Sequence, residues 1–467
     1  MNKKKLVQLG VPHDHVPLAI AGIQAAATRG REDFKAKRFL PQLIAQPDLF
    51  VRDEDFGDLA RAMVADLLNA ETPREVRHAT WGAGLDAGSI QQIETACQLP
   101  VARAAALMPD AHMGYGLPIG GVLACENAVV PYAVGVDIAC RMRLTITDLP
   151  AEPLVENERI ECERFDQALE KGTLFGAGGR WNSPRDHDVL DEDWTITAVT
   201  REVRDRAVGQ LGTSGSGNHF VEWGVLELPE PEFGLQPGRY VALLSHSGSR
   251  GAGARVCQRY SDLARQAIPH RYREDKHLRH LAWLSLDDER GQEYWAAMEL
   301  MGRYAAANHE VIHQTVLGLA GGESLAVIEN HHNFAWKERH GDQELVVHRK
   351  GATPASAGEL GVIPGTMSDT AYVVRGKGEA TSLRSASHGA GRRMSRTEAR
   401  RQFNWKMWQQ HLKERRVRLL AGGIDEVPGA YKDIDTVMSQ QESLVETIAS
   451  FHPRIVMMCG DDSPAED

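Results

Sequence analysis

The sequence has few cysteines, no long apolar run and no overall excess of positive charge. Among 467 residues there are six cysteines, and no two of them form a CxxC pair: Cys97, Cys125, Cys140, Cys162, Cys257 and Cys459. A disulfide framework is therefore excluded, and a zinc ribbon is disfavoured. No apolar stretch reaches the roughly 20 residues of a membrane-spanning helix. Residues 1–17 lack the apolar segment of a secretory signal, so we expect a cytoplasmic protein without a membrane segment.

The net charge of −11 argues against a general, sequence-blind binder of nucleic acids, because such a protein is basic overall. One segment differs from the rest of the chain. Residues 384–420 contain eleven Lys or Arg against two acidic residues, Glu398 and Glu414, which gives a local charge of +9. Such a run is commonly a solvated helix face. The alternative is a surface that binds an RNA backbone.

Four segments have the composition or apolar spacing of helices. Residues 53–71 place Leu59, Met63, Leu67 and Leu68 on one helical face. The spacing also predicts a helix over 87–98, long helices within 255–316 and a basic helix over 394–420.

Other segments alternate short apolar runs with Gly and Pro, which is typical of strands joined by tight turns. They are 99–147, 195–246, 323–388 and a last apolar strand at 454–459. Residues 172–195 are polar and Gly-rich, and we expect them to form a mobile loop.

Strand segments of this kind occur in every third of the chain, with no internal repeat. This distribution favours one compact α+β domain over separate small domains. We therefore expect a helical N-terminal extension over residues 1–84 and a single large domain over residues 85–467.

Several of the nineteen histidines follow apolar or small-residue stretches, most of them beside glycines. The settings are GSGNHFVEW for His219, LLSHSGSRG for His246, IENHHNF for His331 and His332, and SASHGAGRR for His388. A histidine at a strand end beside glycines can turn its ring into a cleft. Asp137 and Cys140 lie three residues apart in AVGVDIACRM, and both could reach one metal centre.

Oxygen, nitrogen and sulfur ligands together suit manganese, zinc, iron or cobalt better than magnesium. A thiolate is also a good bridging ligand, because the ions that it binds deprotonate it. Taken singly, a buried histidine or cysteine is more often a core residue than a ligand, so only the combination indicates a metal site.

Two glycine-rich segments have the chemistry of phosphate binding. GTSGSGN (212–218) lacks the GK[ST] ending, which excludes a Walker-type loop, although its backbone N–H groups can bind anions. Around His388 the residues are small, and Arg392 and Arg393 follow as candidate phosphate ligands. A neutral imidazole there can attack phosphorus and form a phosphoramidate. A simple turn with a hydrogen-bonded histidine is the alternative.

Eight motifs in order resemble those of the RtcB family of RNA ligases, between about residues 85 and 460. They are MPDAHMGYGLPIGG, GVDIACRM, GSGNHFVE, HSGSRG, HHN, GVIPGTM, SHGAGRRMSR and DEVPGAYKDID. The resemblance implies the family's α+β fold, a single large domain with mixed sheets around a cleft for two Mn²⁺ ions. One ion would be bound by Asp137, Cys140 and His219, and the other by Cys140, His246 and His332.

The resemblance also implies GTP as cofactor and His388 as the catalytic histidine that becomes linked to GMP. The residues that match guanine-nucleotide contacts are Asn218, His219, Phe220, Val221, Glu222, His332, Asn333, Pro364, Gly365, Thr366, Met367, His388, Gly389, Ala390 and Gly391. The implied reaction joins RNA 3′-phosphate or 2′,3′-cyclic phosphate ends to 5′-hydroxyl ends, in RNA repair or tRNA splicing.

The sequence departs from the family pattern in three places. Ala139 and Arg141 stand where the family has glycines beside the cysteine, and Arg141 is a candidate RNA-phosphate ligand. Cys459 stands where family members have a lysine before the last glycine. Residues 1–84 have little counterpart. These departures resemble a second, specialised bacterial type that repairs cleaved ribosomal RNA beside a release-factor-like partner.

Two other functions fit parts of the pattern. A metal-dependent phosphodiesterase that opens cyclic phosphates would keep the metal ligands without ligation. A non-catalytic protein that binds damaged RNA would need neither the five metal-ligand candidates nor His388.

Overall fold

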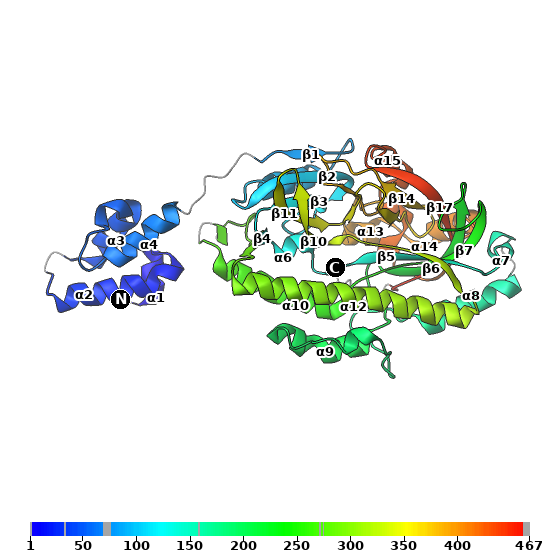
Figure 1. Ribbon diagram of the computed structural model, residues 1–467, viewed down its shortest axis with the longest axis horizontal. Helices are drawn as coiled ribbons and strands as arrows, with labels where there is room; N and C mark the ends of the chain where they lie inside the picture. Colours follow the sequence, from blue (N-terminus) through cyan, green and yellow to red (C-terminus); the bar gives the residue numbers. More distant parts are fainter. Residues whose placement is uncertain are drawn as a thin grey trace. The chain divides into compact units, whose positions relative to one another are not determined.

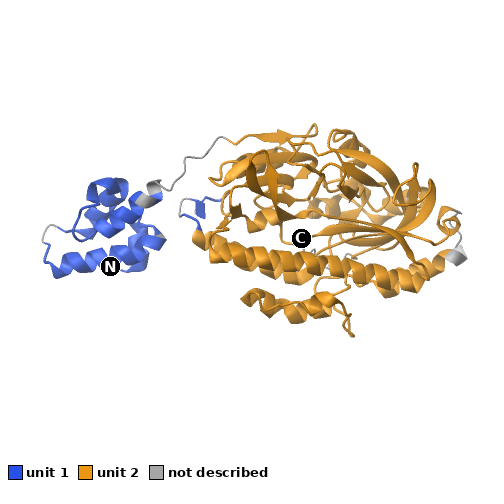
Figure 2. Ribbon diagram, in the orientation of Figure 1, with its two compact units in different colours: residues 1–74, 268–276 blue, residues 75–267, 277–467 orange. Residues whose placement is uncertain are grey.

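The computed structural model describes residues 2–31, 34–68, 76–156, 159–269, 272–273 and 275–460. The chain divides into two compact units, one of residues 1–74 with 268–276 and one of residues 75–267 with 277–467 (Figure 2). Sequence reasoning expected the first part to extend to residue 84. In the structure β1 (His78–Thr80) pairs in parallel with β2 (Ala102–His112) of the larger unit.

The small unit is helical, as the sequence predicts. Its α-helices are α1 (Lys3–Gln8), α2 (Val16–Thr28), α3 (Ala36–Ala45) and α4 (Gly57–Leu68). Their buried apolar side chains form a separate core that includes Leu40, Leu43, Phe56 and Leu59. α4 confirms the helix expected over 53–71 as far as Leu68, and residues 69–71 lie outside the described residues.

The large unit is built on two sheets (Figure 1). In the larger sheet the strand order is β13 (Leu360–Ile363), β14 (Ala371–Gly376), β17 (Val445–Met458), β6 (Phe220–Leu228), β7 (Gly238–Ser247), β5 (Arg141–Thr147) and β9 (Ser324–His331). β16 (Arg418–Ala421) pairs with β17 as the eighth strand. The five-stranded sheet has the order β1, β2, β3 (Ile119–Cys125), β11 (Gln343–Lys350) and β10 (Asn333–His340).

Two short strand pairs complete the sheets: β4 (Ala128–Val129) with β8 (Leu284–Ser285), and β12 (Ala352–Pro354) with β15 (Ser385–Ser387). The mixture of helices and sheets confirms the predicted α+β class. It arises because apolar residues alternate along the strands and recur at helical spacing between them.

Helices cover the sheets and exclude water from their apolar faces. α12 (Glu289–Ala320) and α8 (Arg159–Gly172) pack on the eight-stranded sheet, where Phe165 and Trp223 are buried in one core cluster. α12 begins at the side-chain cap of Asp288 and ends at Gly321, whose φ of 70° suits glycine. The remaining described α-helices are α5 (Ala87–Ala96), α6 (Pro131–Val134), α7 (Glu152–Glu156), α9 (Ala198–Gln210), α10 (Arg250–Ala267), α13 (Arg396–Gln402), α14 (Trp405–Glu414) and α15 (Ile434–Ser439).

Two sequence expectations are corrected by this structure. The prediction of strands over 195–246 is wrong for residues 198–210, which form the helix α9. Thr197 and Thr200 form a capping box that starts this helix. The single basic helix expected over 394–420 is also wrong. Asn404 caps a second helix, α14, and Arg416, with a φ of 57°, turns the chain into β16.

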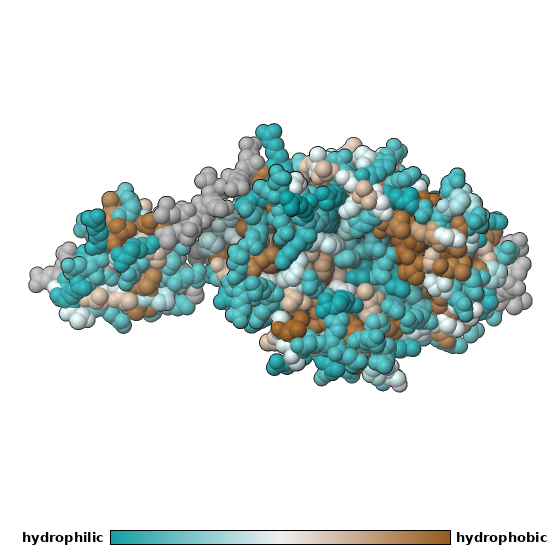
Figure 3. Space-filling view, viewed as in Figure 1, coloured by the Kyte–Doolittle hydropathy of each residue, from teal (hydrophilic) through white to brown (hydrophobic). Residues whose placement is uncertain are grey.

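The loop expected over 172–195 contains one short 3₁₀ turn, Asp188–Leu190, and buries Trp194. Its mobility stays a prediction. Among the described residues, no helix is long and apolar enough to cross a bilayer. Hydrophilic residues cover most of the visible face of the large unit, and apolar residues form separate patches on it (Figure 3).

Candidate metal centre and adjoining pocket

Strand order and register bring the predicted metal ligands together at the same end of four neighbouring strands of the eight-stranded sheet. β6, β7, β5 and β9 are neighbours and run antiparallel, so the starts of β6 and β5 lie beside the ends of β7 and β9. His219 and Cys140 come just before β6 and β5. His246 is near the end of β7, and His332 directly follows β9. Residues far apart in sequence therefore converge at a single point.

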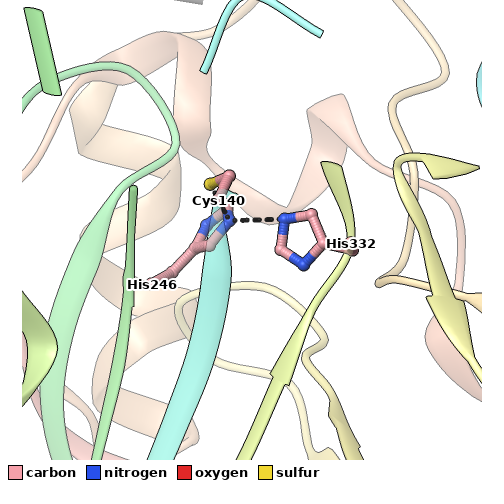
Figure 4. A group of neighbouring side chains, drawn as sticks. All are labelled: Cys140, His246 and His332. Carbon is pink, nitrogen blue, oxygen red and sulfur yellow. Dashed lines mark hydrogen bonds between the residues drawn. The ribbon is translucent and has the colours of Figure 1, made fainter. Parts of the chain in front are cut away.

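The converging side chains form two groups of three that could each hold a cation. One group is Cys140, His246 and His332, and the other is Asp137, Cys140 and His219; within each group the candidate ligand atoms lie within 4.8 Å of one another. Sγ of Cys140 lies 3.1 Å from Nε2 of His246, and the Nε2 atoms of His246 and His332 are 3.2 Å apart (Figure 4). Cys140 belongs to both groups.

Hydrogen bonds to the other ring nitrogens define which atoms can act as ligands. Nδ1 of His219 donates to the carbonyl of Ser214 at 2.9 Å, and Nδ1 of His246 donates to the carbonyl of Asn218 at 3.2 Å. Their Nε2 atoms therefore carry lone pairs. The Nε2 atoms of His219 and His246 lie 3.4 and 3.1 Å from Sγ of Cys140. This arrangement of lone pairs around one sulfur is favourable when cations lie between the atoms. The donor set thus fits a transition metal.

Burial favours the neutral form of His246 and His332, and neighbouring groups favour the charged form of Asp137. Burial, with the charges of His219 and His388, lowers the pKa of His246 to about 3. Burial also holds the pKa of His332 well below its ordinary value. For Asp137, burial raises the pKa, but the hydrogen bond and charge of His219 outweigh burial, so the pKa lies below its ordinary value. These are the protonation states in which such side chains bind metals.

Asp137 is held in place by the segment that follows β7. Its Oδ1 accepts a hydrogen bond from the backbone N–H of Ser249 at 3.0 Å. A Cβ atom at Gly248 would overlap the Asp137 carboxylate, so only glycine fits there. Oδ2 of Asp137 is buried and lies 3.1 Å from Nε2 of His219, so both atoms are close enough to bind the same cation.

The structure shows the settings of Ala139 and Arg141, the two residues beside Cys140 that depart from the family pattern. Ala139 has a φ of 59°, a left-handed conformation that favours glycine. Arg141 is buried, pairs with Glu329 and donates to the carbonyl of Gly302 at 2.9 Å. The interpretation of Arg141 as an RNA-phosphate ligand is therefore replaced by a structural one.

His388 lies next to the metal-ligand cluster, and an aspartate orients its ring. The ring centroids of His388 and His332 are 5.0 Å apart. Nδ1 of His388 lies 2.7 Å from Oδ2 of Asp110, which is fully buried. Burial raises the pKa of Asp110, but the hydrogen bond and charge of His388 outweigh it, so its pKa is below its ordinary value. A carboxylate only accepts, so Nδ1 carries a proton, and in the neutral form of the ring Nε2 therefore carries the lone pair.

Sequence reasoning missed Asp110, although the residue belongs to the MPDAH motif. The signal was its charge within the apolar run AAALMPDA of residues 104–111, because a buried acid needs a partner.

A pocket opens beside His388 and His246, between β6, β17 and two loops. Most of the residues predicted to contact a nucleotide line it: Asn218, Phe220, Glu222, Pro364, Gly365, Thr366, Met367, His388, Gly389, Ala390 and Gly391. Glu222 is 4% exposed, and burial raises its pKa well above the ordinary value. Among the described residues, the Glu222 side chain has no hydrogen-bond partner, which indicates a place for ligand donors.

Other predicted residues lie elsewhere. The side chain of Val221 is buried in the core cluster on the opposite face of β6, which leaves only its backbone near the pocket. Asn333 is used within the protein: its Oδ1 accepts from the N–H of Gly351 at 2.8 Å, and its Nδ2 donates to the carbonyl of Asp137 at 3.3 Å. On β17 the pocket-lining residues are Val456 and Met458 rather than Cys459.

Arg392 lines the same pocket, but its guanidinium group is already bound. It donates to Glu426 and to the hydroxyl of Tyr431, each at 3.2 Å, and to the carbonyl of Asp425 at 2.8 Å. Arg393 donates to the carbonyl of Gly429 at 2.6 Å. Neither arginine is oriented by these bonds as a phosphate ligand.

Residues 91–459 match the family model described as "tRNA-splicing ligase RtcB", and the chain belongs to this RtcB family. It is 34% identical over 406 residues to the RNA-splicing ligase RtcB of Escherichia coli strain K12, which covers 82% of this chain and 97% of the relative. It is 32% identical over 430 residues to the RNA-splicing ligase RtcB of Mycobacterium tuberculosis, with 78% and 98% covered. The tRNA-splicing ligase RtcB of Archaeoglobus fulgidus is 30% identical over 421 residues, with 76% and 87% covered.

Proposed function

We propose that this chain is a GTP-dependent RNA ligase. It joins RNA 3′-phosphate or 2′,3′-cyclic phosphate ends to 5′-hydroxyl ends through a guanylylated His388. The observation that carries the proposal is the position of His388. Its ring is held by Asp110, stands beside the metal-ligand cluster and lines a pocket that also contains Glu222.

The geometry supports a nucleophilic role for Nε2 of His388. With the proton held on Nδ1, the Nε2 lone pair attacks the α-phosphorus of GTP. A P–N bond forms, a P–O bond breaks, and pyrophosphate leaves. An oxygen of the RNA 3′-phosphate then attacks the same phosphorus, the P–N bond breaks, and GMP is linked to the RNA end.

The RNA ends are joined when the 5′-hydroxyl of the second end attacks the phosphorus of the 3′-phosphate and GMP leaves. A cyclic phosphate enters this sequence after water has opened it to a 3′-phosphate. Asp110 accepts from Nδ1 throughout and stabilises the positive charge that develops on the ring as the P–N bond forms.

Two manganese ions would be held by Asp137, Cys140 and His219, and by Cys140, His246 and His332. When bound, such ions stabilise the attacking and leaving oxygens of a phosphoryl displacement. A histidine binds a metal ion in its neutral form, and an aspartate in its charged form. The pKa shifts of His246 and Asp137 favour these forms.

Glu222 supports guanine as the base. Guanine presents adjacent N–H donors on its Watson–Crick edge. The ionised carboxylate of Glu222 can accept from both, and these two hydrogen bonds would offset the effect of burial, which favours the neutral acid. Phe220 and Met367 give the pocket apolar surface for a planar ring. As RNA substrates we propose tRNA or cleaved ribosomal RNA in the cytoplasm, with a release-factor-like partner in the latter case.

The test is covalent labelling of the protein with α-³²P-GTP and Mn²⁺ in the absence of RNA. We expect an acid-labile label on the wild type, no label on His388→Ala, and full labelling of His452→Ala, a histidine on β17 that does not line the pocket. An unlabelled wild type with two bound ions would refute the proposal.

A metal-dependent cyclic phosphodiesterase is a second candidate, favoured by one observation. The resemblance expects a lysine where this chain has Cys459, and the residues of β17 that line the pocket, Val456 and Met458, carry no charge either. Accumulation of 3′-phosphate RNA at every GTP concentration, without joined product, would favour this function.

A further inference from the structure

The basic segment predicted from sequence separates into paired and unpaired cations. Four of its arginines form ion pairs with acidic residues outside the segment. Asp425 and Glu426 pair with Arg392, Arg396 and Arg400, and Asp166 pairs with Arg418. Arg415 lies 4.0 Å from Asp369. In contrast, the other six cations form no ion pair within the described part of the chain: Arg384, Arg393, Arg401, Lys406, Lys413 and Arg416. Three of these six, Lys406, Lys413 and Arg416, lie on α14 or on the turn that follows it.

A groove runs between α14 and β16, and two of these cations line it. Trp405, Gln409, Lys413 and Arg416 lie along it together with Leu419, and the buried side chains of Leu412 and Val417 contribute apolar surface. Lys406 is on the same helix but is not part of the groove. The groove thus combines an aromatic ring, two cations without an ion pair, the paired Arg418 and an apolar floor.

A third cation, Arg454, does not line the groove but lies close enough to Arg416 for the two charges to interact. On β17, one Nη of Arg454 donates to the carbonyl of Pro453 at 2.9 Å, while its buried Nε has no hydrogen-bond partner among the described residues. Burial and the charge of Arg416 lower the pKa of Arg454, whereas the charge of Glu227 raises it. A phosphate bound at Arg416 would reduce the repulsion between the two guanidinium groups.

The chemistry of the groove favours a single-stranded nucleic acid over a protein. Nucleic-acid strands are bound by cations that contact phosphates and by aromatic rings on which bases stack. A double helix hides its base faces, so Trp405 suits an unpaired strand. A stretch of protein would leave Lys413, Arg416 and Arg454 without the regular negative charge that a phosphodiester backbone provides.

The groove shares one wall with the pocket that contains His388. Leu412 and Val417, on the groove side, pack in one cluster with Met367, Val456 and Met458, which line the pocket. α14 is also joined to the pocket loop, since His411 contacts the hydroxyl of Ser368 at 3.1 Å. A strand in the groove would therefore lie one layer of side chains from the pocket.

We propose that the α14–β16 groove binds the single-stranded RNA adjoining the end to be joined, with a base on Trp405 and phosphates on Lys413 and Arg416. The inference rests on the proposed function for the identity of the RNA, but the groove itself is tested by binding alone. Its geometry gives the RNA affinity without base specificity, because every base has a face that can stack.

The experiment measures the affinity of the full chain for a fluorescent single-stranded RNA with a 3′-phosphate, by anisotropy at several salt concentrations. We expect Lys413→Ala and Arg416→Ala to lower the salt slope by about 0.7 each, because each loses one phosphate contact on a single strand. Trp405→Ala should weaken binding about tenfold for all sequences. Lys406→Ala is the matched control, an exposed lysine of α14 outside the groove, and should keep the wild-type salt slope.

Labelling of His388 with GTP in the absence of RNA is measured on the same variants. It reports whether the pocket and fold are intact, and it separates a failure of the groove from a failure of the proposed function. The groove proposal is overturned if Lys413→Ala and Arg416→Ala bind RNA with the wild-type salt slope, or if Lys406→Ala lowers the slope equally. Unchanged RNA affinity in Trp405→Ala together with both cation variants would assign the groove to a protein partner instead.

Discussion

Oδ2 of Asp110 accepts a hydrogen bond from Nδ1 of His388 at 2.7 Å, although 278 positions separate the two residues in the chain. The same oxygen also accepts from the backbone N–H groups of His388 at 3.1 Å and of Gly389 at 3.4 Å. One buried carboxylate therefore fixes both the ring of His388 and the start of the loop that follows it. The orientation of the proposed nucleophile therefore depends on a residue of β2, in the five-stranded sheet.

We predict that Asp110→Asn slows the labelling of His388 by GTP about 100-fold, because an amide no longer holds the proton on Nδ1 or stabilises the charged ring. Quench-flow measurement of labelling at saturating GTP tests this rate. A thermal melt close to that of the wild type would show that the fold is kept. A labelling rate equal to the wild type would contradict the orienting role.

Cys140→Ala should remove both metal ions together, because its thiolate belongs to both ligand groups. The measurement is metal content by mass spectrometry after dialysis against Mn²⁺. Cys257→Ala is the control, since Cys257 is also buried but packs against α6, where its thiol contacts the carbonyl of Pro131 at 3.7 Å. Two ions retained in Cys140→Ala would exclude a bridging cysteine.

Gly248→Ala should weaken one ion selectively. The added methyl group would overlap the Asp137 carboxylate and displace it, whereas Cys140, His246 and His332 keep their positions. Calorimetric titration with Mn²⁺ should then show one tight site in place of two. In the control, Gly318→Ala, the new Cβ meets no atom within 4 Å, so both sites should be kept. Two tight sites in Gly248→Ala would show that Asp137 is not a ligand.

The buried pair of Arg349 and Glu338 predicts a dependence of stability on pH. Arg349 has no exposed side-chain surface and lies 2.5 Å from Glu338. Burial raises the pKa of Glu338, but the charge and hydrogen bond of Arg349 outweigh burial and hold this pKa below its ordinary value of 4.5. A lowered folded-state pKa contributes stability above the unfolded value, and this contribution is lost as the pH falls through the folded value.

We expect Glu338→Gln to cost about 3 kcal/mol of unfolding free energy at pH 7, because Arg349 is left buried and uncompensated. The cost should shrink as the pH is lowered below 4.5, where Glu338 of the wild type also becomes neutral. Urea unfolding of both proteins at pH 7 and at acidic pH measures the difference. An equal cost at both pH values would show that the charge of Glu338 is not the stabilising feature.

The sequence predicted the convergence of the metal-ligand candidates better than it predicted local structure. Asp137, Cys140, His219, His246 and His332 each occupy a motif at a strand end, and the resemblance of these motifs to the RtcB family grouped them into two sets of ligands. Of the adjacent histidines, His331 turns away and packs against Phe334 and Trp336, with ring centroids 5.0 and 4.9 Å apart. Alternation along an extended segment sends neighbouring side chains to opposite faces.

What the sequence did not predict are contacts between distant residues. The charge of the basic segment was visible, but the acids that neutralise much of it, Asp425 and Glu426, lie outside it and are recognised only in the fold. Likewise, Asp110 became a candidate only through its contact with His388. The histidines of α12 are another example. His309 and His313 both hydrogen-bond to the hydroxyl of Ser245, at 2.7 and 2.8 Å, and so support β7 from below rather than bind a ligand.

β17 is the last strand of the described chain, yet it lies in the interior of the eight-stranded sheet, hydrogen-bonded to both β14 and β6. While the ribosome is still making residues 445–458, β6 and β14 have open edges, and the wall of the pocket formed by Val456 and Met458 does not exist. A nascent or prematurely terminated chain therefore offers unpaired strand edges that chaperones and proteases recognise. Assembly of the pocket therefore requires that β17 has been synthesised and has paired with both β14 and β6.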